Sequence, residues 1–295
     1  MGLIIFPIHF CLQVLNLAFW ATLAVTFGLL KFMIRNQGLR VPIDAVLKVI
    51  IAQFGVMSVA MIKFFNRIDI DYKVNGELNP EGWYLVVANH LSYLDIILLI
   101  AFTHERIPTP KFFLKQELIW LPFVGVAAWA LEMPFMKRYS QDFIKKNPHL
   151  KGKDIETTRK HCEKYRDAPT TIINFVEGTR FTPAKQAAKG NKFKHLLPPK
   201  AGGIAFTFAA MGELFTNILD VTLIYPGSKG VIMMDMLSGN LKQVIFDVDI
   251  LPVKPELIGD YFNDAEFRDG FQQNLNQHWQ NKDAKITALL EELKA

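Results

Sequence analysis

The stretch "VVANHLSYLD", residues 86–95, decides the fold of this 295-residue chain. A run of strand-forming apolar residues ends at Asn89-His90, and Ser92 is a typical N-cap for the helical segment that begins with Tyr93. His90 should therefore project from a strand-to-helix turn, with Asp95 about one turn into the helix. Either this is only a buried strand that meets a helix, or His90 and Asp95 form a catalytic pair at the mouth of an α/β site.

Such a pair has the chemistry of a general base. If the Asp95 carboxylate accepts the Nδ1–H of His90, it selects the tautomer in which Nε2 is free to take a proton. This arrangement needs no protein nucleophile, and backbone N–H groups at the helix start after His90 are candidate oxyanion donors. Histidine and aspartate also occur at this spacing by chance, so these two residues alone favour the structural interpretation.

Outward from this stretch, short β-rich runs alternate with helical ones. Strands bounded by turn residues are predicted at 67–74, 83–89, 170–177, 221–226 and 244–251. Helices are predicted at 92–104, 155–166 and 202–214, and the C-terminal segment reads as a polar surface helix. This alternation predicts an α/β domain over residues 68–295, with a mixed sheet flanked by helices. Chemistry in such sheets gathers where strands end and helices begin.

The composition indicates a chain that works beside a membrane. Hydrophobic residues make up 51%, and the mean hydropathy of +0.17 is high for a soluble enzyme. The net charge of +5 suits anionic lipid or phosphorylated substrates, whereas the usual nucleic-acid recognition motifs are absent from the sequence. Cys11 and Cys162 read as isolated thiols in a reducing compartment, and no zinc-ligand spacing is present, so no structural metal is expected.

The excess of apolar residues lies at the N-terminus. Residues 1–30 carry no charged side chain. This uncharged segment is longer than the ~20 residues needed to cross a bilayer. A second uncharged segment, residues 49–62, is short for a crossing and predicts an interfacial or re-entrant helix, with a two-helix hairpin as the alternative. Lys and Arg flank both ends of that segment and belong on the cytoplasmic side. Residues 1–67 are therefore expected to anchor the domain at 68–295 to a membrane.

Two further stretches carry residues suited to a phosphorylated lipid. In "NFVEGTRF", residues 174–181, a strand delivers Glu177, and Gly178 permits a tight turn before Thr179 and Arg180. The following residues, to position 212, contain cations and no acidic residue, which is typical of a phosphate-attracting loop or a membrane-facing patch. The apolar stretch 113–138 ends in cations, so it is either a core helix and hairpin or the lining of an acyl-chain tunnel.

Four motifs together resemble a known family. "NHLSYLD", "LKQEL…LPFVG…PFMKR", "FVEGTR" and "LIYP" are similar, in order and spacing, to the four blocks of the glycerolipid and lysophospholipid acyltransferases. Lysophosphatidate acyltransferases, which make phosphatidate, are the best-known members. The resemblance covers roughly residues 70 to 230. "MPFMKRYS" and "LLPPKAGG" further resemble a bacterial inner-membrane branch, related to eukaryotic lysophosphatidate and lysocardiolipin acyltransferases.

The resemblance implies a glycerol-phosphate acyltransferase-like fold held at the cytoplasmic face of a bacterial inner membrane. It implies acyl transfer to a lysophospholipid hydroxyl, with acyl-CoA or acyl carrier protein as co-substrate and no other cofactor. By position, His90 and Asp95 resemble the catalytic dyad. The residues that match the family's substrate-binding blocks are Lys115, Phe135, Lys137, Arg138, Glu177, Gly178, Thr179, Arg180 and Pro226. Among these, the two arginines would hold the acceptor phosphate.

Departures from the family pattern concern the acceptor rather than the dyad. Glu132 replaces a common glycine, Val176 a frequent proline and Phe181 a frequent serine, and Tyr225 precedes Pro226. The sequence therefore predicts transfer to the sn-2 hydroxyl of lysophosphatidate, with lysophosphatidylglycerol or lysocardiolipin as alternative acceptors. Other hypotheses are a thioesterase, a Ser92 acyl-enzyme, and an inactive lipid-binding scaffold.

Overall fold

The structure, a computed structural model, describes residues 2–70, 72–121, 124–136, 165–228 and 231–294. Most of the helix predicted at 155–166 lies outside these residues, as do Lys137, Arg138 and Cys162. The prediction for that helix therefore stays a prediction.

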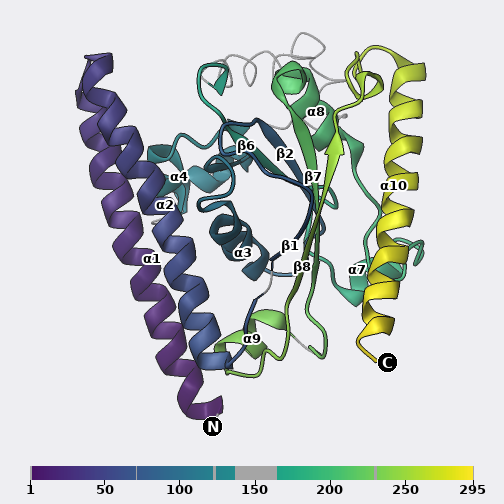
Figure 1. Cartoon of the computed structure of the whole chain (residues 1–295), viewed down its shortest axis with the longest axis horizontal. Helices are drawn as coiled ribbons and strands as arrows, with labels where there is room; N and C mark the ends of the chain where they lie inside the picture. The colour runs from purple at the N-terminus through teal and green to yellow at the C-terminus, as the bar shows by residue number, and fades with distance from the viewer. Residues whose placement is uncertain (1, 71, 122–123, 137–164, 229–230, 295) are drawn as a thin grey trace.

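A six-stranded mixed sheet forms the centre of the domain, as the sequence predicted, with the strand order β1-β8-β7-β2-β6-β3 (Figure 1). Four strands run parallel, whereas β8 pairs antiparallel with β7 and parallel with β1 at the edge. The strands are β1 (Tyr72–Asn75), β2 (Tyr84–Ala88), β3 (Pro110–Phe112), β6 (Thr171–Phe175), β7 (Asn217–Ile224) and β8 (Ile245–Pro252). A second sheet pairs β4 (Leu114–Lys115) with β5 (Phe135–Met136).

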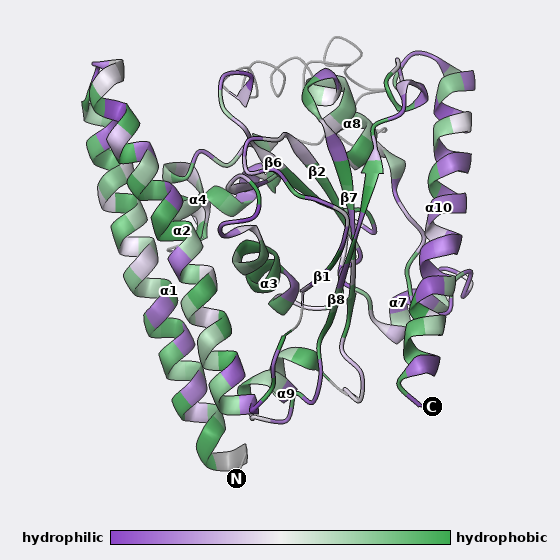
Figure 2. Ribbon diagram, viewed as in Figure 1, coloured by the Kyte–Doolittle hydropathy of each residue, from purple (hydrophilic) through white to green (hydrophobic). Residues whose placement is uncertain are grey.

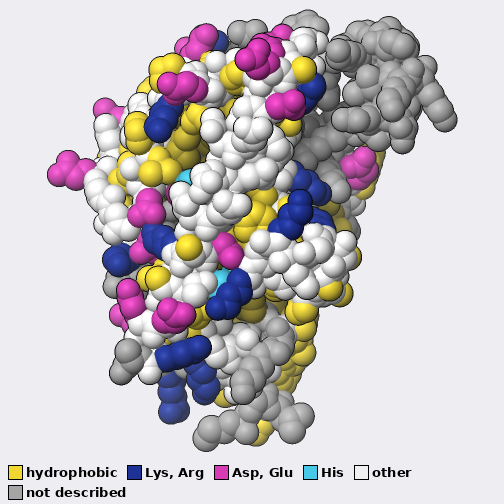
Figure 3. Space-filling view, turned by 90° about the vertical axis from the view of Figure 1, so that its right-hand side faces the viewer, with side chains coloured by type: hydrophobic (Ala, Val, Ile, Leu, Met, Phe, Trp, Pro, Cys, Tyr) yellow, Lys and Arg dark blue, Asp and Glu magenta, His cyan; other side chains and the backbone are white. Residues whose placement is uncertain are grey.

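Helices cover both faces of the sheet. α3 fills the space between the N-terminal helices and one face, while α8 and α10 cover the other face (Figure 1). Among the described residues of the domain, the helices are α3 (Leu94–Thr103), α4 (Val124–Ala130), α7 (Pro183–Ala188), α8 (Ala201–Met211), α9 (Ile232–Leu237) and α10 (Ala265–Glu292), with 3₁₀ turns at η1 (Gln116–Trp120), η4 (Gly212–Leu214) and η5 (Pro255–Leu257). Cations and anions are intermixed over the face that α10 covers (Figure 3).

Strand β2 is buried along its whole length because both of its faces are covered. Tyr84, Val86 and Ala88 join the hydrophobic core under α3, and Leu85 and Val87 join the core under α8 and α10. A strand buried on both faces reads as a continuous apolar run, and β2 shows this pattern. Its last residue, Ala88, is in register with Phe175 of β6 and Val221 of β7, so β2 and β6 end together at one edge of the sheet while β7 continues to Ile224.

The N-terminal region is a helical hairpin. α1 (Gly2–Met33) and α2 (Gln37–Asn66) are joined by three residues, and both are long and apolar enough to cross a membrane by length and composition. Apolar residues dominate both helices (Figure 2). The second helix is longer than the predicted segment 49–62 because it begins at Gln37 and carries Asp44 and Lys48 within it. The hairpin alternative therefore describes the structure.

Polar and small residues hold this hairpin together and against the domain. Asn16 donates to the hydroxyl of Ser58 at 2.8 Å, and Gln13 donates to the Ser58 carbonyl at 3.2 Å. Such bonds set the register of two apolar helices. Gly28 allows α1 to touch α4, because a Cβ at this position would lie 2.4 Å from the Cβ of Ala130. The hairpin thus packs along the side of the domain.

Candidate active site

His90 and Asp95 meet at the edge of the sheet where β2 ends. Nδ1 of His90 lies 2.8 Å from Oδ2 of Asp95, which is fully buried, whereas the His90 side chain is 12% exposed. Because the carboxylate can only accept, Nδ1 carries the proton and Nε2 is left as the acceptor. The tautomer that the sequence predicted for a general base is therefore the one this geometry favours.

Asp95 is held by further donors in the turn before α3. The backbone N–H groups of Leu91 and Ser92 donate to Oδ2 at 2.6 and 2.9 Å, and the hydroxyl of Tyr225 donates to Oδ1 at 2.6 Å. Its place in the first turn of α3 also suits a negative charge. The N–H groups of Leu91 and Ser92 are thus engaged by the carboxylate, so the expectation that N–H groups after His90 form the oxyanion hole is wrong for these two.

Ser92 caps the helix differently from the sequence prediction. α3 begins at Leu94, so Tyr93 occupies the N-cap position and makes no side-chain cap bond. The hydroxyl of Ser92 accepts the N–H of Leu94 at 3.2 Å, and the side chain is buried. A buried hydroxyl engaged in this turn is poorly placed to act as a nucleophile.

Glu177 links the third block to the turn that holds His90. Its fully buried carboxylate accepts the backbone N–H of His90 and that of Leu197, each at 2.9 Å. Burial raises the pKa of Glu177 to about 7, although both N–H groups favour its charged form. The prediction that Glu177 binds substrate stays a prediction, but the observed contacts make it a residue that positions the His90 backbone.

The rest of the third block lies beside His90. Gly178 has a φ of +66°, a conformation that favours glycine, and the N–H of Phe181 donates to the His90 carbonyl at 2.7 Å. The hydroxyl of Thr179 accepts from Lys185 at 2.7 Å. The guanidinium of Arg180 lies 3.8 Å from the ring centroid of Tyr93, which keeps this cation over the start of α3.

Phe175 at the end of β6 supplies one wall of the site. The His90 imidazole stacks on the Phe175 ring with 4.0 Å between ring centroids. This contact limits rotation of the imidazole, while Asp95 limits it from the other side. Pro226, predicted for the acyl pocket, directly follows Tyr225 at the end of β7, so the fourth block reaches the dyad through its tyrosine.

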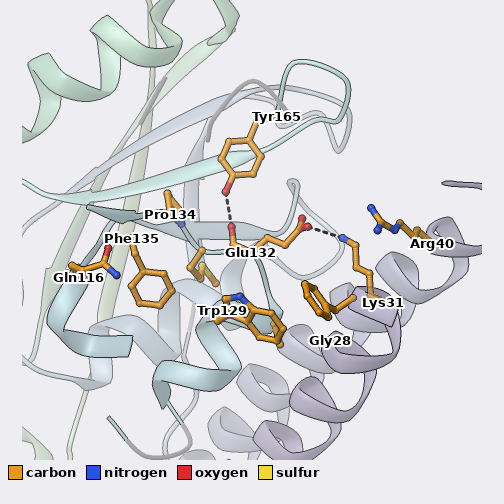
Figure 4. Close-up of a pocket in the computed structure, with 12 residues that line it drawn as sticks. Gly28, Lys31, Arg40, Gln116, Trp129, Glu132, Pro134, Phe135 and Tyr165 are labelled. Atoms are coloured by element: carbon orange, nitrogen blue, oxygen red, sulfur yellow. Dashed lines mark hydrogen bonds and ion pairs between the residues drawn. The ribbon is translucent and has the colours of Figure 1, made fainter. Parts of the chain in front are cut away.

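The second block forms a pocket of about 410 Å³ at the junction with the hairpin (Figure 4). Phe135 and Trp129 line its apolar part, and Lys31 of α1 reaches across to Glu132 at 2.8 Å. Glu132, which replaces the family's glycine, has a φ of +56° and pairs with the hairpin. Lys115 lies in β4 opposite Met136, but its side chain is not described, and Lys137 and Arg138 lie outside the described residues.

A second His–Asp pair, which the sequence reading missed, lies under α10. Nε2 of His278 is 3.1 Å from Asp220 of β7, and the buried Lys282 donates to the same carboxylate at 2.5 Å. Burial alone would raise the pKa of Asp220, but Lys282 and His278 hold it well below its usual range. Within the described part of the chain, no group of three His, Cys, Asp or Glu side chains is arranged to hold a metal ion.

These features define an α/β protein with a hydrogen-bonded His–Asp pair at the carboxyl edge of its sheet. The family model described as Acyltransferase matches residues 70–252, more than half of the chain, so the chain belongs to this acyltransferase family.

Curated relatives agree with that family, and a solved structure agrees with the fold. Human 1-acyl-sn-glycerol-3-phosphate acyltransferase delta is 26% identical over 166 residues, which cover 52% of this chain and 41% of that protein. The mouse gamma form is 26% identical over 214 residues, covering 68% and 51%. The chain thus spans about half the length of these relatives. The crystal structure of the 1-acyl-sn-glycerophosphate (LPA) acyltransferase PlsC from Thermotoga maritima matches with a TM-score of 0.54 at 19% identity, over 100% of this chain and 98% of that one, and supports the fold.

Proposed function

We propose that this protein transfers a fatty acyl group from acyl-CoA or acyl carrier protein to the sn-2 hydroxyl of lysophosphatidate, giving phosphatidate. The observation that carries this proposal is the oriented pair of His90 and Asp95, with Nδ1 2.8 Å from the carboxylate and Nε2 free to accept a proton. The family match over residues 70–252 supports acyl transfer as the reaction.

His90 acts as the general base in a single step. Its Nε2 takes the proton of the acceptor hydroxyl while the hydroxyl oxygen attacks the thioester carbonyl carbon. The C–S bond breaks, and the imidazolium returns the proton to the departing thiolate. Asp95 stabilises the imidazolium, and general-base help of this kind typically accelerates a reaction by ~10²–10⁴-fold. Holding both substrates in reactive geometry adds to this effect.

Arg180 is the candidate ligand of the acceptor phosphate in this proposal. It follows the buried Glu177 by three residues and is held over Tyr93 at the start of α3, next to the catalytic turn. A guanidinium binds phosphate through paired hydrogen bonds. Arg138, Lys137 and Lys115 are proposed to assist from the second block, as the family resemblance implies.

The hairpin is proposed to hold the domain at the cytoplasmic face of a bacterial inner membrane. Many large apolar side chains of α1 and α2 are exposed, including Ile4, Phe32 and Phe64, each at least 70% exposed. Exposed apolar surface of this extent marks a membrane or protein contact. The acyl acceptor and product are themselves membrane lipids, so the anchor brings the site to its substrate.

The test uses the purified full-length chain in detergent, with radiolabelled oleoyl-CoA and radiolabelled oleoyl acyl carrier protein as separate donors. Lysophosphatidate, lysophosphatidylglycerol and monolysocardiolipin are supplied separately, and products are separated by thin-layer chromatography. We expect phosphatidate to form fastest. Faster acylation of another lysophospholipid would keep the chemistry and change the acceptor, whereas hydrolysis alone would indicate a thioesterase. No transfer to any acceptor from either thioester donor would overturn the proposal in favour of the scaffold.

The same assay separates the one-step reaction from an acyl-enzyme. Ser92→Ala should retain most of the wild-type rate, because the buried hydroxyl only caps the turn before α3. Trapping of a labelled acyl group on the wild-type chain, lost in Ser92→Ala, would contradict the one-step mechanism.

A further inference from the structure

Tyr225 makes the most direct contact with the dyad from outside the first block. It follows β7, and its hydroxyl lies 2.6 Å from Oδ1 of Asp95, 130 residues away in the chain. The side chain is buried. Because a carboxylate can only accept, the phenol is the donor in this bond.

The two oxygens of Asp95 have separate partners. Oδ2 accepts from the His90 imidazole and from the N–H groups of Leu91 and Ser92. Among the hydrogen bonds between described residues, the donor to Oδ1 is the Tyr225 hydroxyl. The phenol therefore holds the oxygen of the carboxylate that the turn after His90 does not hold, and the two sets of bonds together fix the plane of the carboxylate.

The phenol remains a donor over the whole working pH range. Burial, and then the neighbouring Asp95 carboxylate, raise the pKa of Tyr225 well above its usual value. The other ionisable groups around the pair are Glu177, which accepts the His90 N–H, and Tyr72, which acts on Tyr225. Lys282 acts on Glu177 from the opposite side of the sheet, and Arg180 lies over Tyr93.

We propose that Tyr225 is a positioning residue of this site, which orients Asp95 and tunes the proton affinity of the His90 imidazole through that carboxylate. This inference rests on the proposed role of His90 as the base. A charge-assisted hydrogen bond between phenol and carboxylate shares negative charge that would otherwise stabilise the imidazolium. This role also explains why a tyrosine stands before Pro226 in this chain, where the sequence departs from the family pattern.

Tyr225→Phe removes the donor and keeps the ring. Without the phenol, more of the Asp95 charge acts on the imidazole, so the titration midpoint of His90 should lie higher in this variant than in the wild type. The carboxylate also loses an anchor, so kcat should fall about tenfold with little change in KM, the effect of losing one such bond. Replacing Tyr225 with 3-fluorotyrosine keeps the packing and strengthens the donor, so the midpoint should fall instead.

Tyr72→Phe is the matched control. The Tyr72 hydroxyl is buried and has no hydrogen-bond partner among the described residues, and its ring packs against Phe102 and Phe246. Like Tyr225→Phe, this substitution deletes a buried tyrosine hydroxyl beside the same hydrophobic core. Because that hydroxyl does not contact Asp95, its removal should leave both kcat and the His90 titration unchanged.

The experiment follows ¹³C-labelled histidine in the full-length chain by NMR against pH, with the His90 signal assigned from its loss in His90→Ala. Midpoints that move up in Tyr225→Phe and down in the fluorotyrosine chain, with reduced kcat in Tyr225→Phe, support the inference. An unmoved midpoint or a wild-type kcat in Tyr225→Phe overturns the inference. If the midpoint is unmoved and the melting temperature is lowered, the role of Tyr225 is structural only. The titration does not depend on the acceptor, so a wild-type chain that acylates nothing refutes the proposed function separately.

Discussion

Two His–Asp pairs lie on opposite sides of the same sheet, and their surroundings differ. His90 and Asp95 meet at the start of α3 at 2.8 Å, and His278 of α10 meets Asp220 of β7 at 3.1 Å. The carboxylate is buried in both pairs, and the imidazole of His278, at 32% exposed, is more open to solvent than that of His90. Distance and exposure alone would therefore make the second pair an equally good base.

The two pairs differ in the groups that donate hydrogen bonds to each carboxylate. Asp95 is met by backbone N–H groups and a phenol, which are neutral donors, so the carboxylate has no fixed cation beside it among these partners. Asp220 is met by the ammonium of the buried Lys282, whose own pKa burial lowers despite this pairing. A third ion adds little to a pair that is already neutral. In the proposed mechanism, the base dyad uses the carboxylate without a fixed cation, whereas the contacts of His278 and Lys282 with Asp220 fasten α10 to the sheet.

Exchanging the carboxylate for an amide in the first pair should give the largest effect. Asp95→Asn keeps an oxygen for the N–H groups of the turn but loses the charge that orients and stabilises protonated His90. We expect the rate of acyl transfer to fall by ~10²–10⁴-fold with little change in melting temperature. Measured rates and circular dichroism of the purified variant check this. A variant with more than a tenth of the wild-type rate would contradict the role assigned to Asp95.

The same exchange in the second pair should act on stability instead. Asp220→Asn leaves the Lys282 ammonium buried without its counter-ion, which costs about 3–5 kcal/mol of the free energy of unfolding. Acyl transfer at temperatures where the variant is folded should stay near the wild-type rate. Chemical denaturation in detergent measures the first quantity. Unchanged stability, or lost activity in the folded variant, would break the comparison.

Glu177 should make stability depend on pH. The pKa of Glu177 is about 7 in the folded chain and near 4.5 without burial, so the folded chain holds this proton more tightly than the unfolded chain does. The stabilisation of the folded chain by this protonation is complete below pH 4.5 and is lost as the pH rises through 7. The free energy of unfolding should fall by about 3 kcal/mol across this window because of Glu177. Denaturation at several pH values checks the slope. In Glu177→Gln this part of the slope should vanish, and equal slopes in both chains would contradict the assignment.

The smallest expected effect concerns the contact between Arg180 and Tyr93. Tyr93→Leu removes the aromatic face under the guanidinium, which is worth about 1 kcal/mol. The KM for lysophosphatidate should rise about fivefold while kcat changes little. A monoacylglycerol acceptor, which has no phosphate, should show no such rise. An equal change for both acceptors would mean that Tyr93 does not act through the phosphate ligand.

The local part of the site could be predicted from the sequence. The strand, the turn and the helix that hold His90 and Asp95 are adjacent in the chain, and Glu177 to Arg180 follow a strand end in the same way. The contact between Tyr225 and Asp95 could not, because it depends on how β7 lies beside β2 in the finished sheet.

Other parts left a signal that was readable but ambiguous. Lys282 lies at helical spacing among Phe271, Leu275, Trp279 and Ile286, a cation in an apolar stripe that requires a buried partner. The second hairpin helix was predicted too short because Lys48 looked like its boundary, whereas this side chain lies exposed on the helix. A charged residue such as Lys48 can therefore lie within a helix when the helix exposes one face, so it does not mark the end of that helix.

The most direct test of the account compares His90→Ala with His278→Ala in acyl transfer from radiolabelled oleoyl-CoA to lysophosphatidate. Each variant removes one imidazole from a His–Asp pair. The account predicts a rate reduced by ~10²–10⁴-fold for His90→Ala and a rate within about twofold of wild type for His278→Ala, with both variants folded. Equal rates in the two variants, or a larger loss in His278→Ala, would contradict the assignment of His90 as the base.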